Sequence, residues 1–183
     1  MTLVIPSLTS GRCPVVQVRV IGIAVDPGAQ PLILLKPLTD VAGAGRMLPI
    51  WIGPQEATSI FIAIEGAEAP RPLAHDLMKS LLEALDAQVE RVDVTRIEAG
   101  TFYAEITLST RNGVRIIDSR PSDAIALAAR VDAPIWVADD VLEDAGIPDE
   151  AVEGRVEEAA DEEAKLDEFK RFLDEVDPED FQG

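Results

Sequence analysis

The sequence predicts an α/β protein of the α+β kind: a mixed, largely antiparallel sheet with a three-strand meander and packed helices, plus an acidic C-terminal helical tail. Three observations lead to this prediction. Segments rich in β-branched residues alternate with helical patterns along the chain. Turn signals join three consecutive strand patterns between residues 89 and 117. Acidic residues concentrate at the C-terminus, where residues 138–183 hold 19 of the 34 acids.

The first half of the chain predicts three strands and two helices. Strand patterns cover 15–25, 32–36 and 47–52, and Pro49 places the third at a sheet edge or a bulge. One helix runs from Pro54 to a stop at Gly66, and another covers 73–86. Each helix has an apolar stripe that we expect to be buried. In the first helix the stripe consists of Ala57, Ile60, Phe61 and Ile64. In the second it consists of Leu77, Leu81 and Leu85, flanked by Ala74 and Met78.

The second half predicts the meander and the helix that follows it. Strands at 89–97, 101–110 and 114–117 are joined by a three-residue hairpin loop at 98–100 and by the tight hairpin signal Asn112-Gly113. A helix then starts at Pro121, because proline is tolerated in a first helical turn. A strand at 134–137 and a short helix at 139–145 are the last elements predicted before the acidic C-terminal segment.

These patterns divide the chain into three parts. We expect an N-terminal extension of residues 1–13, a domain of residues 14–148, and an acidic linker with an amphipathic helix in residues 149–183. The apolar seam of that last helix needs a partner, which is the domain itself, a second subunit or another protein. The seam consists of Leu166, Phe169, Phe172 and Leu173.

The composition excludes several classes of protein. A single cysteine, Cys13, rules out a disulfide framework within one chain and a multi-cysteine zinc site, and favours the cytoplasm. The N-terminus has no basic region before an apolar run, and no apolar run is long enough to cross a membrane, so we expect no membrane partner. The net charge of −18 lies mostly in the tail, since residues 1–137 hold 15 acids and 12 bases.

Several kinds of catalytic site are also excluded. The chain has no P-loop, no dinucleotide-binding glycine pattern after a strand and no nucleophile elbow. With His75 as the single histidine, a two-histidine zinc helix is impossible, and a Ser-His-Asp triad would have to use His75 itself. What remains is carboxylate chemistry, in which acids bind a cation such as Mg²⁺ that activates water at a phosphodiester.

The most informative stretch is 118–128, where a polar turn leads from a strand directly into a helix. Free N–H groups and the positive end of the helix dipole gather there, beside Asp118, Arg120 and Asp123. The junction can therefore bind an anion or polarise a bond. In the structural alternative, Ser119 or Ser122 caps the helix and Asp123 favours its dipole. That alternative leaves Arg120 needing a carboxylate or a bound anion to compensate its charge.

Two further polar residues stand out. Glu65 lies at the C-terminal end of its helix and opposes the helix dipole, as residues at functional sites often do. The alternative is an exposed glutamate or a salt bridge to Arg71. His75 lies in a first helical turn, which favours the neutral imidazole that accepts or donates a proton. The alternative is a histidine that only hydrogen-bonds across a packing seam.

Four segments in this order resemble the bifunctional nuclease domain: 48–57, 71–77, 100–104 and 119–128. The resemblance covers roughly residues 14–147. It implies an α/β domain with a mixed or antiparallel sheet and helices, often dimeric, that degrades both DNA and RNA without strong sequence preference. Carried over by position, the polar motif residues are Glu56, Glu65, His75, Asp76, Asp118, Arg120, Ser122 and Asp123.

On this resemblance we assign roles to the motif residues. Asp118 and Asp123 would bind Mg²⁺ or Mn²⁺ or activate water, His75 would be a general acid or base, and Glu65 is the remaining catalytic candidate. Arg120 would clamp the phosphate, because a guanidinium matches phosphate bidentately. The residues that we expect to bind substrate are Arg120, Ser122, Arg71 and Arg115.

Two other functions are compatible with the same junction. In the first, the protein is a non-enzymatic dimeric binding module, whose junction forms a subunit interface and whose acidic tail docks a protein partner. In the second, it is a regulator that binds a small anionic metabolite at the helix N-terminus. A groove shared by His75 and Asp118 would favour the enzyme, whereas burial of Arg120 against its neighbours would favour a structural role.

Overall fold

The computed structural model describes residues 14–38, 45–67 and 69–148, and every structural statement below refers to them. The chain divides into two compact units, Met1–Ile147 and Pro148–Gly183. The expected N-terminal extension and the acidic linker with its amphipathic helix lie outside the described residues. Within those residues, every helix is too short or too polar to cross a lipid bilayer.

Eight strands form one sheet in the order β6-β5-β4-β7-β1-β2-β3-β8. Strands β4 and β7 pair in parallel, whereas β1–β2, β1–β7, β2–β3, β4–β5 and β5–β6 pair antiparallel. The predicted mixed, largely antiparallel sheet and its meander β4-β5-β6 are confirmed. The strands are β1 (Val15–Val25), β2 (Pro31–Pro37), β3 (Arg46–Trp51), β4 (Gln88–Glu98), β5 (Thr101–Thr110), β6 (Gly113–Ser119), β7 (Ile135–Ala138) and β8 (Ile147–Pro148).

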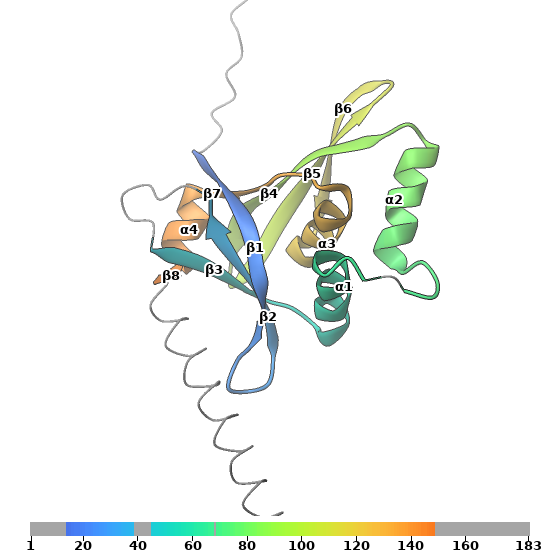
Figure 1. Ribbon diagram of the computed structural model, residues 1–183. Helices are drawn as coiled ribbons and strands as arrows, with labels where there is room; N and C mark the ends of the chain where they lie inside the picture. Colours follow the sequence, from blue (N-terminus) through green and yellow to red (C-terminus); the bar gives the residue numbers. More distant parts are fainter. Residues whose placement is uncertain (1–13, 39–44, 68, 149–183) are drawn as a thin grey trace, which may run out of the picture. The chain divides into compact units, whose positions relative to one another are not determined.

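Four helices accompany the sheet: α1 (Pro54–Ile64), α2 (Ala74–Ala84), α3 (Pro121–Val131) and α4 (Asp139–Ala145). Helices α1, α2 and α3 gather on one side, whereas α4 lies beside β3 and β7 (Figure 1). Helix α3 is central, because it contacts α1, α2, β4 and β5. Its small residues allow this close approach, and Ala124, Ala126 and Ala128 are almost fully buried.

The hairpin turns of the meander follow the glycine pattern. The β4–β5 loop has two residues, Ala99 and Gly100, one fewer than expected, and both adopt positive φ. At the β5–β6 turn, Gly113 has a φ of 98°, which a residue with a side chain rarely adopts. The Asn112-Gly113 hairpin is confirmed.

The expected burial of α2 is wrong. Leu77, Leu81 and Leu85 are 55%, 53% and 72% exposed, and the one buried residue of α2 is His75. The helix packs on α3 through its polar first turn, so its apolar stripe faces away from the core. On α1 the prediction holds for Ala57 and Ile60, but Phe61 and Ile64 are exposed. Apolar periodicity identifies a face without identifying what covers it.

Two smaller expectations also change. Pro49 suggested a sheet edge or a bulge for β3. The two-residue strand β8 lies outside β3, and the register of β3 with β2 runs without a shift. No serine caps α3: Arg120 occupies the N-cap position without a side-chain cap hydrogen bond. The hydroxyl of Ser119 instead donates to the carbonyl of Ala104.

Candidate active site at the start of helix α3

Arg120 connects the first turns of α1 and α3. Its Nε and Nη2 donate to the two carboxylate oxygens of Asp123 at 2.7 and 2.9 Å, and Nη1 donates to Oε1 of Glu56 at 2.9 Å. The arginine side chain is nevertheless 64% exposed. A guanidinium has five N–H groups, so two remain for a ligand. The carboxylates hold the guanidinium in one orientation, while its outer edge stays open to solvent.

His75 connects all three helices. Its Nε2 lies 3.3 Å from Oδ1 of Asp123 on α3, and its Nδ1 lies 2.9 Å from Oγ of Ser59 on α1. An ionised carboxylate only accepts hydrogen bonds, so Nε2 carries the proton and donates it to Asp123. The imidazole is 7% exposed. It therefore supports Asp123 from inside the protein, and the order Ser59, His75, Asp123 resembles a triad in its contacts.

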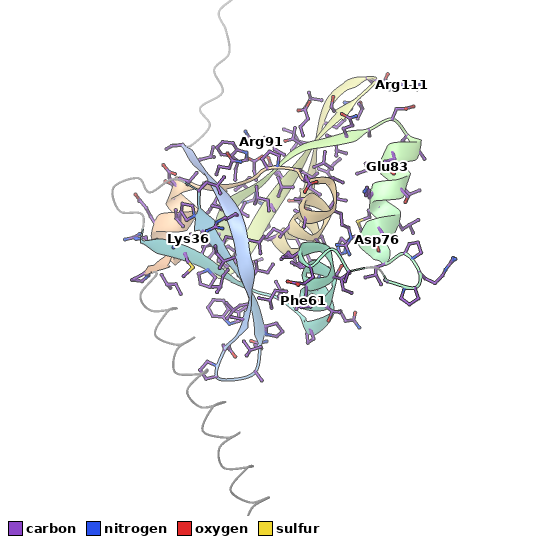
Figure 2. All side chains as sticks on the ribbon, viewed as in Figure 1. Lys36, Phe61, Asp76, Glu83, Arg91 and Arg111 are labelled. Carbon is purple, nitrogen blue, oxygen red and sulfur yellow. The ribbon has the colours of Figure 1, made fainter. Side chains whose placement is uncertain are left out.

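A second ion pair closes the network behind His75. Nε of Arg130 donates to Oδ1 of Asp76 at 2.5 Å, and its Nη2 donates to Ser59 at 3.2 Å. The other Asp76 oxygen accepts the backbone N–H of Leu73, at the start of α2. Asp76 lies on the side of α2 that faces α1 and α3 (Figure 2). Because the Arg130 side chain is only 6% exposed, this pair fixes α2 against α3.

These contacts keep the carboxylates ionised. Burial raises the pKa of Asp123, but the hydrogen bonds and charges of Arg120 and His75 outweigh it and leave the pKa below its ordinary value. Arg130 lowers the pKa of Asp76, against the effect of burial and with help from the Leu73 N–H. The Asp123 and Glu56 carboxylates raise the pKa of Arg120. At neutral pH the network is a set of paired charges.

An open pocket of about 430 Å³ lies at the exposed side of Arg120. Its lining combines polar residues, which include Arg120, Glu56 and the buried Ser122, with aromatic and apolar residues. The starts of α1 and α3 both border it, and neither helix has a side-chain cap. The pocket is lined by Gln30, Ile50, Trp51, Ile52, Gly53, Glu56, Gly100, Thr101, Phe102, Arg120, Pro121 and Ser122.

Comparison with known proteins now gives the family. The model of the bifunctional nuclease domain matches residues 37–150, which include the network and every residue that lines the pocket except Gln30. The chain belongs to the bifunctional nuclease domain family. The resemblance expected from the four segments is confirmed.

Relatives of two kinds accompany this family match. An uncharacterized protein of Mycobacterium tuberculosis (strain H37Rv) is 42% identical over 170 residues, 91% of this chain and 98% of that protein. Bifunctional nuclease 1 of Arabidopsis thaliana is 30% identical over 115 residues, 61% of this chain and 34% of the plant protein. Bifunctional nuclease 2 of the same plant is 30% identical over 98 residues, 52% of this chain and 30% of its own length. The chain therefore matches about a third of each plant protein.

The family domain brings together only some of the residues predicted from sequence. Asp123, His75 and Arg120 share the network, and Ser122 lines the pocket with Arg120. Asp118 points from β6 as an exposed residue paired in register with Glu105, outside both network and pocket. Neither Asp118 nor His75 is among the residues that line the pocket beside Arg120.

The other predicted residues lie at the surface. Glu65, Arg71 and Arg115 are exposed and take no part in the network, and the suggested Glu65–Arg71 salt bridge is absent among the described residues. In the same part of the chain, no three His, Cys, Asp or Glu side chains are grouped so that they could hold a metal ion. The metal-binding roles of Asp118 and Asp123 therefore stay predictions.

Sequence reasoning missed Ser59, the position of Arg130 in the network, and the aromatic residues of the pocket. A signal for the first two was present. Ser59 lies three residues after Glu56, and Arg130 lies seven residues after Asp123, so each pair shares one face of its helix. The aromatic residues had no such signal, because Trp51 and Phe102 come from separate strands.

Proposed function

We propose that the protein is a nuclease that hydrolyses phosphodiester bonds of DNA and RNA with little sequence specificity at the pocket beside Arg120. The observation that carries this proposal is the exposed guanidinium, held by two carboxylates at the start of α3 with N–H groups to spare. The names of the plant relatives, bifunctional nucleases 1 and 2, support the same activity. Low specificity follows because a phosphate is identical at every nucleotide.

The residues at the pocket suggest a division of labour. Arg120 donates to the non-bridging oxygens of the phosphate and stabilises the charge that grows there. Glu56 accepts a proton from the attacking water, whose oxygen forms the new P–O bond while the bond to the leaving ester oxygen breaks. The leaving oxygen takes its proton from solvent. Asp123 and His75 are positioning residues, since Asp123 accepts hydrogen bonds from Arg120 and His75 contacts Asp123.

We include in this proposal that cleavage requires a divalent metal ion. Mg²⁺ or Mn²⁺ is the expected cofactor of carboxylate-based phosphodiester hydrolysis. The residues around Arg120 do not form a three-ligand cluster, so no step above uses a metal ion. The assay below therefore compares Mg²⁺, Mn²⁺ and EDTA.

We further propose that the protein works in the cytoplasm as a homodimer built on α2. The single cysteine supports that compartment. Helix α2 exposes Leu77, Leu81 and Leu85, and edge strand β6 exposes Val114, Ile116 and Ile117. An ion pair between Arg111 and Asp86 places the β5–β6 turn beside the end of α2. Exposed apolar side chains on a helix and a sheet edge that lie together are typical of a protein interface.

The decisive experiment compares cleavage by the wild type, Arg120→Ala and Arg115→Ala. Purified proteins are incubated with single- and double-stranded DNA and RNA under the three metal conditions. Arg115 is the matched control, because it is an exposed arginine of the neighbouring strand outside the network. We expect Arg120→Ala to lose about 100-fold in cleavage rate and Arg115→Ala to keep it. Circular dichroism establishes that both variants are folded.

Three results would argue against the nuclease. Equal cleavage by the wild type and Arg120→Ala would indicate a contaminant or another site. Nucleic-acid binding without cleavage under any condition would favour the non-enzymatic binding module. Binding of neither DNA nor RNA would leave the regulator of a small anionic ligand as the remaining candidate for the pocket.

A further inference from the structure

The aromatic residues of the pocket beside Arg120 have no role in the phosphate chemistry described above. Trp51 lies at the end of β3 and is 52% exposed, and Phe102 comes from the start of β5. Both line the same pocket as Arg120 and Ser122. When Arg120 binds a phosphate, a nucleobase attached to that phosphate can stack on a large exposed indole in the same pocket.

The indole of Trp51 is held in place although it is exposed. Its Nε1 donates to Oδ2 of Asp26 at 3.0 Å, and the other oxygen of Asp26 accepts the N–H groups of Gly28 and Gln30. These hydrogen bonds with Gln30, Trp51 and Gly28 lower the pKa of Asp26, so the anchor is ionised at neutral pH. A ring fixed before binding loses little entropy when a ligand stacks on it.

Charge alone gives this pocket little affinity for a polyanion. Among the residues that line it, Arg120 is the one cation and Glu56 the one acid, and Asp123 also pairs with Arg120. A base stacked on an aromatic ring adds binding energy that does not depend on charge. The volume of about 430 Å³ falls within the range of pockets for small organic ligands.

We propose that this pocket holds an unpaired nucleobase stacked on Trp51 while the adjoining phosphate binds Arg120. The proposal rests on the nuclease function and narrows its substrate to single-stranded nucleic acid. In a duplex the bases are paired and stacked inside the helix, and extracting one costs unstacking energy. Stacking tolerates every base, so single-strand preference is compatible with low sequence specificity.

The test measures oligonucleotide binding by fluorescence anisotropy in EDTA, with the integrity of each oligonucleotide checked afterwards. Three probes are compared: a short single strand, an abasic strand with the same phosphates, and a hairpin duplex. Trp51→Ala removes the ring and Trp51→Phe restores an aromatic face. Phe61→Ala is the matched control, because Phe61 is 55% exposed on α1 and does not line the pocket (Figure 2).

We expect the wild type to bind the single strand more tightly than the abasic strand and the duplex. Trp51→Ala should weaken single-strand binding roughly 5- to 150-fold, whereas Trp51→Phe and Phe61→Ala should keep most of it. Arg120→Ala should weaken binding of the single strand and the abasic strand alike. The comparison of the normal and abasic strands on the wild-type protein does not depend on the folding of any variant.

Different outcomes separate this inference from the nuclease proposal. Equal wild-type affinity for the normal and abasic strands, with loss in Arg120→Ala, would overturn base stacking and leave the phosphate site standing. Equal affinity for duplex and single strand would also overturn it. Failure of the wild type to bind any probe would overturn the inference together with the proposed function.

Discussion

Glu56 and Arg120 are 64 residues apart in sequence, and Oε1 of Glu56 accepts a hydrogen bond from Nη1 of Arg120 at 2.9 Å. The contact places a carboxylate and a guanidinium side by side at the edge of one pocket, between the starts of α1 and α3. The second Glu56 oxygen is not engaged by Arg120. Glu56 can therefore accept a proton next to a phosphate that Arg120 holds.

Glu56→Gln should separate chemistry from binding. We expect its cleavage rate to fall at least about 100-fold, because an amide cannot act as a general base. Its affinity for single-stranded DNA should stay the same or rise, since a negative charge near the phosphate is removed. Cleavage rate and anisotropy are measured on the same preparation. Glu65→Gln makes the same charge change at the far end of α1 and should leave the cleavage rate and the affinity unchanged. A Glu56→Gln variant that cleaves as fast as the wild type would exclude Glu56 as the general base.

Stability should fall in acid through Asp76 and Asp123. Both have folded-state pKa values below their ordinary values. Such groups stabilise the fold above the pKa of the unfolded chain, about 3.9, and that contribution is lost as pH falls through the folded-state values. Urea midpoints should change little between neutral pH and about pH 5 and drop below about pH 4. Asp76→Asn and Asp123→Asn should each make this drop in the urea midpoint shallower. If the midpoint of the variants fell as steeply as that of the wild type, the loss of stability in acid would come from other groups.

Removing Asp76 should destabilise the protein more than removing an exposed acid. Arg130 is almost fully buried, so Asp76→Ala leaves an unpaired cation inside and should cost about 2–3 kcal/mol, a value reduced for the partial exposure of Asp76. Asp76→Leu combined with Arg130→Leu should recover most of the loss. Glu98→Ala breaks the exposed pair with Arg96 and should cost no more than about 0.5 kcal/mol. Equal urea-unfolding losses for Asp76→Ala and Glu98→Ala would contradict the structural role of the buried pair.

Binding should depend weakly on salt. Because Arg120 is the one cation of the described pocket, one or two phosphates are neutralised, and the slope of log affinity against log salt for a single strand should be about −0.7 to −1.4. Anisotropy titrations over a series of salt concentrations give this slope. Arg120→Ala should flatten it by about 0.7. A slope several times steeper would reveal a basic surface elsewhere.

Leu81→Lys should prevent dimer formation. Leu81 lies in the middle of the exposed stripe of α2, where a charge would have to be desolvated in an interface. Light scattering after gel filtration should give a dimer for the wild type and a monomer for this variant. Val25→Lys, at an apolar residue of β1 that is more exposed than Leu81, is the control and should remain dimeric. A wild type that is monomeric at all concentrations would leave α2 without this partner.

Most of the fold could be predicted from short-range patterns in the sequence. Pro121 gave the start of α3, and Asn112-Gly113 gave the β5–β6 hairpin, because each acts within one or two residues of backbone. The apolar stripe of α2 was predicted as a stripe but assigned to the wrong surroundings. Periodicity depends on one helix alone, whereas burial depends on a neighbouring element that the pattern does not contain.

The sheet meander, the strand–helix junction and the charged residues of that junction could be predicted from the chain, since they follow from backbone preferences and side-chain chemistry. The contact of Arg120 with Glu56, the contact of His75 with Ser59 and the separate position of Asp118 could not. Nor could the pocket that Trp51 and Arg120 both line. The physical reason is that the packing of α1, α2 and β3 around α3 sets these distances, and packing is a property of surfaces that no single segment contains.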